Sequence, residues 1–154
     1  MIRTPQQVLA AALFLLISHL QLGLSQDNPV TVDLSIFVVS VVGGEETFTE
    51  ATEARPGQVV EYRLTTTNAG DTTLPPSSVS VTGPIPDTTL YVPDSATPSS
   101  DTVLTEVSVS GDSYSEPDQN DNQEAYSVIR WTLLNAMEPG DTAEVSYRVT
   151  VSDE

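Results

Sequence analysis

Hydrophobic and polar residues alternate along much of this chain, with the two-residue period of β-strands that bury one face. In Val59–Thr67, Glu61 and Arg63 are predicted to face outward, and the inward face is formed by Val60, Tyr62, Leu64 and Thr66. Similar apolar segments predict further strands over Val30–Val42, Val79–Val81, Leu90–Val92, Val103–Val109, Tyr126–Leu134 and Ala143–Val151.

Turn residues separate these segments every 8–15 residues, and no stretch longer than ten residues shows the 3.6-residue apolar spacing of an amphipathic helix. The 46–53 segment predicts a short additional edge strand, where glutamates would oppose edge-to-edge aggregation. About seven strands in one domain predict an all-β fold, an antiparallel β-sandwich.

Several apolar residues are candidates for the core of this sandwich. Val128, Trp131 and Leu133 are expected inside, and the last strand presents one inward face made by Val145, Tyr147, Val149 and Val151. Trp131, Tyr62, Tyr91 and Tyr147 could line a carbohydrate-binding face, but their places on alternating strands favour core packing. Tyr114 and Tyr126 are expected to be freer to lie at the surface.

Residues 1–25 have the three parts of a secretory signal peptide. Arg3 gives a basic start, Val8–Ile17 is an unbroken apolar run of ten residues, and Gly23 and Ser25 are small residues before Gln26. A bilayer span needs ~20 residues, so this run predicts a cleaved signal and no stable membrane span afterwards. The domain is then 26–154. We expect it to be exported to the periplasm or the extracellular space, where it could associate with the cell surface.

The formal net charge is −17, from 22 acidic residues and five arginines, and the chain has no lysine and no cysteine. Removal of the predicted signal peptide takes away Arg3 and the sole histidine, His19. The mature chain then lacks the residues of a Ser-His or Cys-His nucleophile, a Schiff-base lysine or a His/Cys zinc site. Phosphate backbones would repel so acidic a protein. We therefore expect no enzyme activity, no catalytic residues, no cofactor and no nucleic-acid partner.

Three motifs, in order, resemble a known family. The first begins at Pro56-Gly57 and continues through Val60, Tyr62, Leu64, Asn68 and Gly70. The second runs from Val79 to Pro86 and leads to Tyr91-Val92, and the third joins Trp131 to Pro139-Gly140-Asp141 and Tyr147-Arg148-Val149. Together they resemble the conserved repeat of bacterial and archaeal surface proteins called Domain of Unknown Function eleven, across roughly residues 33–151.

This resemblance implies an immunoglobulin-like sandwich in a secreted or cell-surface protein, and it brings no catalytic residues. The chain departs from the family pattern at Gly83, where Asp is frequent, at Thr88, where Gly is frequent, and in an acidic loop over 111–125. A chain without cysteine also suits a bacterial or archaeal secreted protein better than a small eukaryotic one, which would often rely on disulfides.

The acidic loop contains the main candidate for a metal site. Oxygen-bearing side chains at Asp118, Asn120, Asp121, Asn122 and Glu124 could surround Ca²⁺, which takes six to eight oxygen ligands. The run is similar to the calcium-binding linker of cadherins, although it lacks the proline that follows there. The alternative is a solvated loop whose like charges repel one another, and we favour that alternative.

Two catalytic patterns have simpler explanations. Asp141-Thr142-Ala143 matches a catalytic triplet of aspartic proteases, but that chemistry needs a second copy to form the carboxyl dyad, and a turn-capping Asp explains it. Carboxylate pairs for glycoside hydrolysis could be drawn from any of the 22 acidic residues, so they have little diagnostic weight.

The sequence favours a secreted, non-enzymatic immunoglobulin-like module with a structural or protein-interaction role at the cell envelope. Its partner would be a protein or glycan of the envelope or the extracellular space, bound through edge strands or loops. The alternative is a calcium-dependent adhesion or glycan-binding module that uses the acidic loop 112–124.

Overall fold

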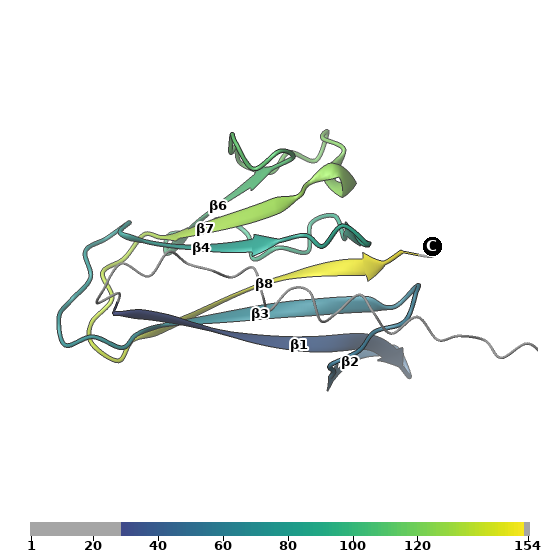
Figure 1. Cartoon of the computed structure of the whole chain (residues 1–154), viewed down its shortest axis with the longest axis horizontal. Helices are drawn as coiled ribbons and strands as arrows, with labels where there is room; N and C mark the ends of the chain where they lie inside the picture. Colours follow the sequence, from purple (N-terminus) through teal and green to yellow (C-terminus); the bar gives the residue numbers. More distant parts are fainter. Residues whose placement is uncertain (1–28, 153–154) are drawn as a thin grey trace, which may run out of the picture.

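Two antiparallel β-sheets pack face to face in the computed structural model, which describes residues 29–152 (Figure 1). The described residues form strands and one short 3-10 helix, η1. The bounds are β1 Val30–Val42, β2 Glu45–Glu50, β3 Val59–Asn68, β4 Val79–Pro84, β5 Thr89–Tyr91, β6 Val103–Ser108, η1 Gln123–Ala125, β7 Val128–Leu133 and β8 Thr142–Val151. The predicted antiparallel β-sandwich is confirmed, and it fits an immunoglobulin-like arrangement. The predicted signal peptide, residues 1–25, lies outside the described residues.

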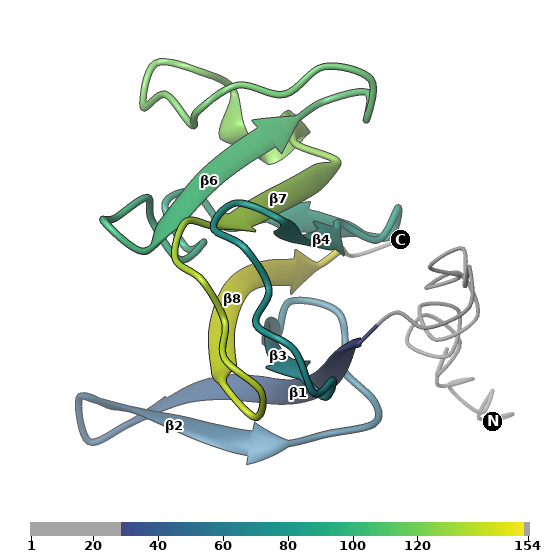
Figure 2. The same cartoon turned by 90° about the vertical axis from the view of Figure 1, so that its left-hand side faces the viewer.

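The larger sheet has the strand order β2-β1-β3-β8-β5, and the smaller sheet has the order β4-β7-β6. Figure 2 shows β8 between the layer of β4, β6 and β7 and the strands β3 and β1. The predicted edge strand exists as β2, and all six of its residues are exposed. β1 is an inner strand between β2 and β3, although Val41 and Val42 at its end are exposed because β3 pairs with β1 only as far as Val39.

Aromatic side chains fill the space between the sheets. The rings of Tyr62 and Tyr147 stack with their centroids 5.0 Å apart, and Trp131 lies 5.9 Å from Tyr147. Burial raises the pKa of Tyr62 to about 12. The polar atoms of Tyr147 and Trp131 have hydrogen-bond partners. The Tyr147 hydroxyl donates to the carbonyl of Pro84 at 2.7 Å, and the Trp131 indole donates to the carbonyl of Thr97 at 3.1 Å. The predicted core positions of these aromatic residues are therefore confirmed, and Tyr91 is buried with them.

Two sequence-based placements were wrong, and a third residue is more buried than its position suggests. Val128 is only half-buried, because β7 directs Ile129, Trp131 and Leu133 inward and Val128 falls on the opposite side of the two-residue alternation. Tyr126, expected near the surface, is 5% exposed and packs against Tyr91 with ring centroids 5.7 Å apart. Glu61 lies on the outer face as predicted, yet it is only 6% exposed because other side chains cover it.

The absence of a side chain at Gly83 has a packing role. A Cβ at this position would lie 2.6 Å from Cε1 of Tyr147 and 3.0 Å from Cζ3 of Trp131. Because these rings belong to β8 and β7, the absent side chain lets β4 approach both of them closely. An aspartate side chain would not fit there without displacing the rings.

Substitution of Gly83 should therefore destabilise the sandwich. We expect Gly83→Ala to lower the free energy of unfolding by about 1–3 kcal/mol, because the new methyl group overpacks the core. Urea titration followed by tryptophan fluorescence measures the change. The neighbouring Thr82→Ala, at an exposed site, is the control and should change stability by about 0.5 kcal/mol or less. Equal effects of the two substitutions would contradict the proposed close packing.

Candidate functional site

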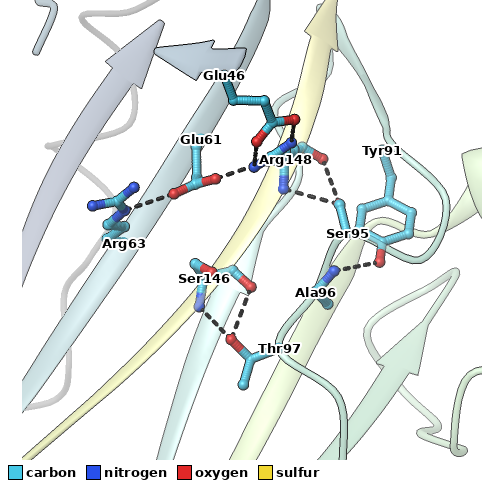
Figure 3. A network of polar contacts seen from close by, with 9 residues as sticks. All are labelled: Glu46, Glu61, Arg63, Tyr91, Ser95, Ala96, Thr97, Ser146 and Arg148. Atoms are coloured by element: carbon cyan, nitrogen blue, oxygen red, sulfur yellow. Dashed lines mark hydrogen bonds and ion pairs between the residues drawn. The ribbon is translucent and has the colours of Figure 1, made fainter. Parts of the chain in front are cut away.

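A network of charged side chains braces the outer face of the larger sheet (Figure 3). The carboxylate of Glu61 accepts hydrogen bonds from Nε of Arg63 at 2.6 Å and from Nε of Arg148 at 2.7 Å. Arg148 also donates two hydrogen bonds, both of 2.8 Å, to the carboxylate of Glu46. These two carboxylates raise the pKa of Arg148 above its usual range, and Glu46 has the larger effect. The guanidinium therefore remains charged. The buried charge of Glu61 is thus compensated on both sides.

The network requires the β1–β2 hairpin to curl over the sheet. Neighbouring strands lie about 4.8 Å apart, so in a flat sheet β2 would be about 14 Å from β8, three strands away. An ion pair of 2.8 Å between Glu46 and Arg148 therefore requires the hairpin to bend toward β8. Phe48 follows the same bend, and the guanidinium of Arg63 lies over its ring at 4.7 Å and over the Phe37 ring at 4.5 Å. These contacts are structural bracing of the fold.

Loss of Arg148 should cost more stability than loss of Arg130, a half-buried arginine with a single carboxylate partner. Arg148→Gln leaves Glu61 with one cationic partner, so we expect the free energy of unfolding to fall by about 2–3 kcal/mol. Arg130→Gln is the matched control, because Arg130 pairs with Glu106 on a more exposed part of the smaller sheet and should cost about 1 kcal/mol or less. Chemical denaturation measures both, and equal losses would contradict the bracing role of the network.

The segment after β5 continues along the free side of β8 (Figure 3). The backbone N–H groups of Val92 and Thr97 donate to the carbonyls of Arg148 at 3.0 Å and Ser146 at 2.8 Å. In return, the N–H of Arg148 donates to Oγ of Ser95 at 3.0 Å, and the N–H of Ser146 donates to Oγ1 of Thr97 at 2.9 Å. Residues 92–97 therefore extend the pairing that β5 begins, partly through side chains.

Beyond Thr97 this segment leaves β8 and crosses to the smaller sheet. The N–H of Ser100 donates to the carbonyl of Val103 at 2.8 Å, and the carbonyl of Thr102 accepts from Leu134 at 2.8 Å. The first residues of β8 are left without a neighbouring strand on that side. A groove of about 340 Å³ opens there between the two sheets.

The groove has an apolar floor and an acidic rim. Val103, Leu133, Met137, Ala143 and Val145 contribute apolar side chains from both sheets. The charged residues at the rim are Asp141 and Glu144, both exposed, and the lining contains no arginine. Oδ2 of Asp141 accepts a hydrogen bond of 2.8 Å from the N–H of Glu138, so Asp141 caps a turn, as the simpler interpretation of the Asp141-Thr142-Ala143 motif predicts.

The acidic loop forms its own hydrogen bonds. Oδ1 of Asp118 accepts from the backbone N–H and the side-chain amide of Asn120, at 2.8 and 2.7 Å, and these bonds hold the pKa of Asp118 below its usual range. Oδ2 of Asp121 accepts from the hydroxyl of Tyr126 at 3.1 Å. Within residues 29–152, no three or more His, Cys, Asp or Glu side chains gather as a metal-binding group. The structure does not bring Asp118, Asp121 and Glu124 into one ligand set.

Two residues near this loop have roles that sequence reasoning missed. The Gln123 side-chain amide accepts from the N–H of Asp94 at 2.9 Å and donates to Oδ1 of Asp94 at 3.1 Å, which ties the loop to the turn after β5. In the structure, Gln123 is only 6% exposed. In the sequence, an isolated glutamine in an acidic run gives no indication of this burial. Tyr114 is half-buried, and the Arg130 guanidinium lies 3.8 Å from its ring centroid.

We expect calcium to leave the stability of the protein unchanged. Calcium at 100 times its dissociation constant would add ~2.7 kcal/mol, and Asp118 and Asp121 are occupied by the loop's own donors. Thermal melts of the full chain in millimolar calcium, in chelator and in sodium chloride of equal ionic strength should coincide. A melting temperature that rises only with calcium, and no longer rises after Asp118→Asn and Asp121→Asn, would instead establish the calcium-binding alternative.

The fold and its surfaces define an antiparallel β-sandwich with a braced outer face and an uncovered stretch of strand edge. Comparison of the chain with protein families, curated proteins and solved structures finds no match. Among the described residues, no helix has the length and apolar character needed to cross a membrane. The resemblance to Domain of Unknown Function eleven therefore stays a prediction that rests on the motifs.

Proposed function

We propose that this protein is a secreted, non-enzymatic, immunoglobulin-like module with a protein-interaction role at the cell envelope. The observation that carries the proposal is the stretch of β8 edge beside the groove between the sheets, which residues 92–97 do not cover. Uncovered strand edges offer backbone donors and acceptors to another chain, and β-strand addition is a common way for a sandwich to bind a peptide segment.

Two further features support this proposal. The apolar run at Val8–Ile17 predicts export, which would bring the domain to envelope or extracellular partners. The best-connected charged groups of the described residues, Glu61, Arg63 and Arg148, are held in ion pairs that brace the larger sheet. These ion pairs have a structural role: they stabilise a scaffold whose strand edges are available for binding.

The proposal predicts that Thr142 contacts another protein in the intact envelope. A photoreactive amino acid placed at this exposed position of β8 should give a covalent adduct of higher mass on irradiation of whole cells. The same amino acid at Ser80, an exposed position of β4, is the matched control and should give little adduct. The mass of the exported chain should correspond to a start at Gln26. Retention inside the cell, or equal adducts at both positions, would overturn the proposal.

A further inference from the structure

The direction of the backbone groups of β8 shows what the groove offers to a ligand. In an antiparallel strand, successive residues direct their N–H and C=O groups to opposite sides. Ser146 and Arg148 direct theirs away from β3, since both bond to residues 92–97. By the same alternation, Thr142 and Glu144 also direct their N–H and C=O groups away from β3, toward the side where the groove opens.

The other edges of the sandwich are protected in ways that this stretch is not. β2 carries three glutamates in six residues, and β4 ends at Pro84, whose ring nitrogen has no hydrogen to donate. The edge of β6 is partly covered, because the backbone N–H of Thr105 donates to Oγ of Ser99 and Val107 exchanges backbone hydrogen bonds with Ser115 in both directions. The first residues of β8 have neither protection, and they adjoin the groove with its apolar floor.

We propose that the groove binds an extended, cationic peptide segment of a partner protein, which adds to β8 at Thr142–Glu144 as an antiparallel strand. This inference rests on the proposed interaction function and names its site and the chemistry of its partner. Antiparallel addition continues the pairing that β5 makes with β8. The stretch is short, so the ligand would pair through about three to five residues.

The alternation of an added strand determines which side chains the segment needs. Successive residues would face the interior of the sandwich and the outer face in turn. The inward-facing residues would meet Val103, Leu133 and Met137 at the floor of the groove. A cavity of 150 Å³ holds a benzene ring, so about 340 Å³ has room for roughly two apolar side chains. Valine, leucine or a similar residue is therefore expected at every second position.

The outward-facing residues of the segment would lie beside the side chain of Glu144. Opposite charges across a strand pair stabilise the pairing, and like charges oppose it. Asp141 adds a second negative charge at the rim, and no arginine of this chain lines the groove. Lysine or arginine is therefore expected opposite Glu144. A second copy of this chain is disfavoured as the occupant, since a net charge of −17 repels another copy.

Amide hydrogen exchange of the full chain, resolved by NMR, tests the free edge before any ligand is added. The N–H of Glu144 should exchange at least about tenfold faster than those of Val145 and Tyr147, which face β3. Equal protection of these three amides would show that the edge is already covered and would overturn the inference. Protection of Glu144 that grows with protein concentration, together with a dimer mass, would assign the groove to a second copy instead.

A blocked peptide of alternating valine and lysine residues is the probe for the partner's chemistry. At 100 times its dissociation constant it should slow the exchange of Glu144 about hundredfold. A valine–glutamate peptide of equal length should not. Methylation of the lysine backbone nitrogens should abolish binding, since in antiparallel pairing a residue opposite Glu144 donates its N–H to β8. Methylation of the valine nitrogens, which point away from β8, should be tolerated. Equal binding of both methylated peptides would exclude strand addition.

Charge reversal at the rim completes the test. Glu144→Lys should weaken binding of the valine–lysine peptide about fivefold or more and should allow binding of the valine–glutamate peptide. Glu53→Lys, at an exposed glutamate far along the chain from the groove, is the control and should change neither. If Glu144→Lys has no effect, the cationic partner is wrong. An adduct at Thr142 in cells without peptide binding would retain the interaction function and reject only this partner chemistry.

Discussion

The contact between Gly83 and the rings of Tyr147 and Trp131 is the constraint on which the two-layer arrangement depends. It sets how closely β4 approaches β8, and the hydrogen bond from Tyr147 to the Pro84 carbonyl holds that approach from the adjacent residue. The indole of Trp131 fastens residues 92–97 through the carbonyl of Thr97, and the same segment then pairs with β8. The course of the chain beside β8, and so the place where the groove opens, follows from this packing between the sheets.

The alternation of apolar residues was sufficient to predict the strands and their assembly into a sandwich, because a two-residue period is a local property of the chain. It also placed Tyr62, Tyr91, Trp131 and Tyr147 correctly in the core. Val128 was misplaced because the run around it has apolar residues on both faces of the strand. The alternation alone therefore does not show which set of residues faces inward. Only the pairing register with β4 and β6 resolves that ambiguity.

The surface features depend on contacts between distant parts of the chain, and the sequence gives little sign of them. Glu61 is covered because Arg148, 87 residues away, and the curled β1–β2 hairpin lie over it. Tyr126 is buried because the acidic loop turns back through η1 and Gln123 attaches it to Asp94. The uncovered edge of β8 exists because residues after Thr97 pair with the smaller sheet. Composition indicated an acidic protein, but it could not indicate where an edge would be left open.

The central position of β8 also has a consequence for how the molecule folds. β8 joins the larger sheet between β3 and β5, and its Arg148 reaches Glu46 across a sequence separation of 102 residues. Until residues 142–151 are available, β3 lacks one neighbour, Glu61 lacks one of its two counter-ions and Tyr62 has no ring to stack upon. Such long-range pairing makes folding slow relative to proteins built from local contacts. The larger sheet therefore closes only when β8 is in place, so the native packing of its inner strands forms late in folding.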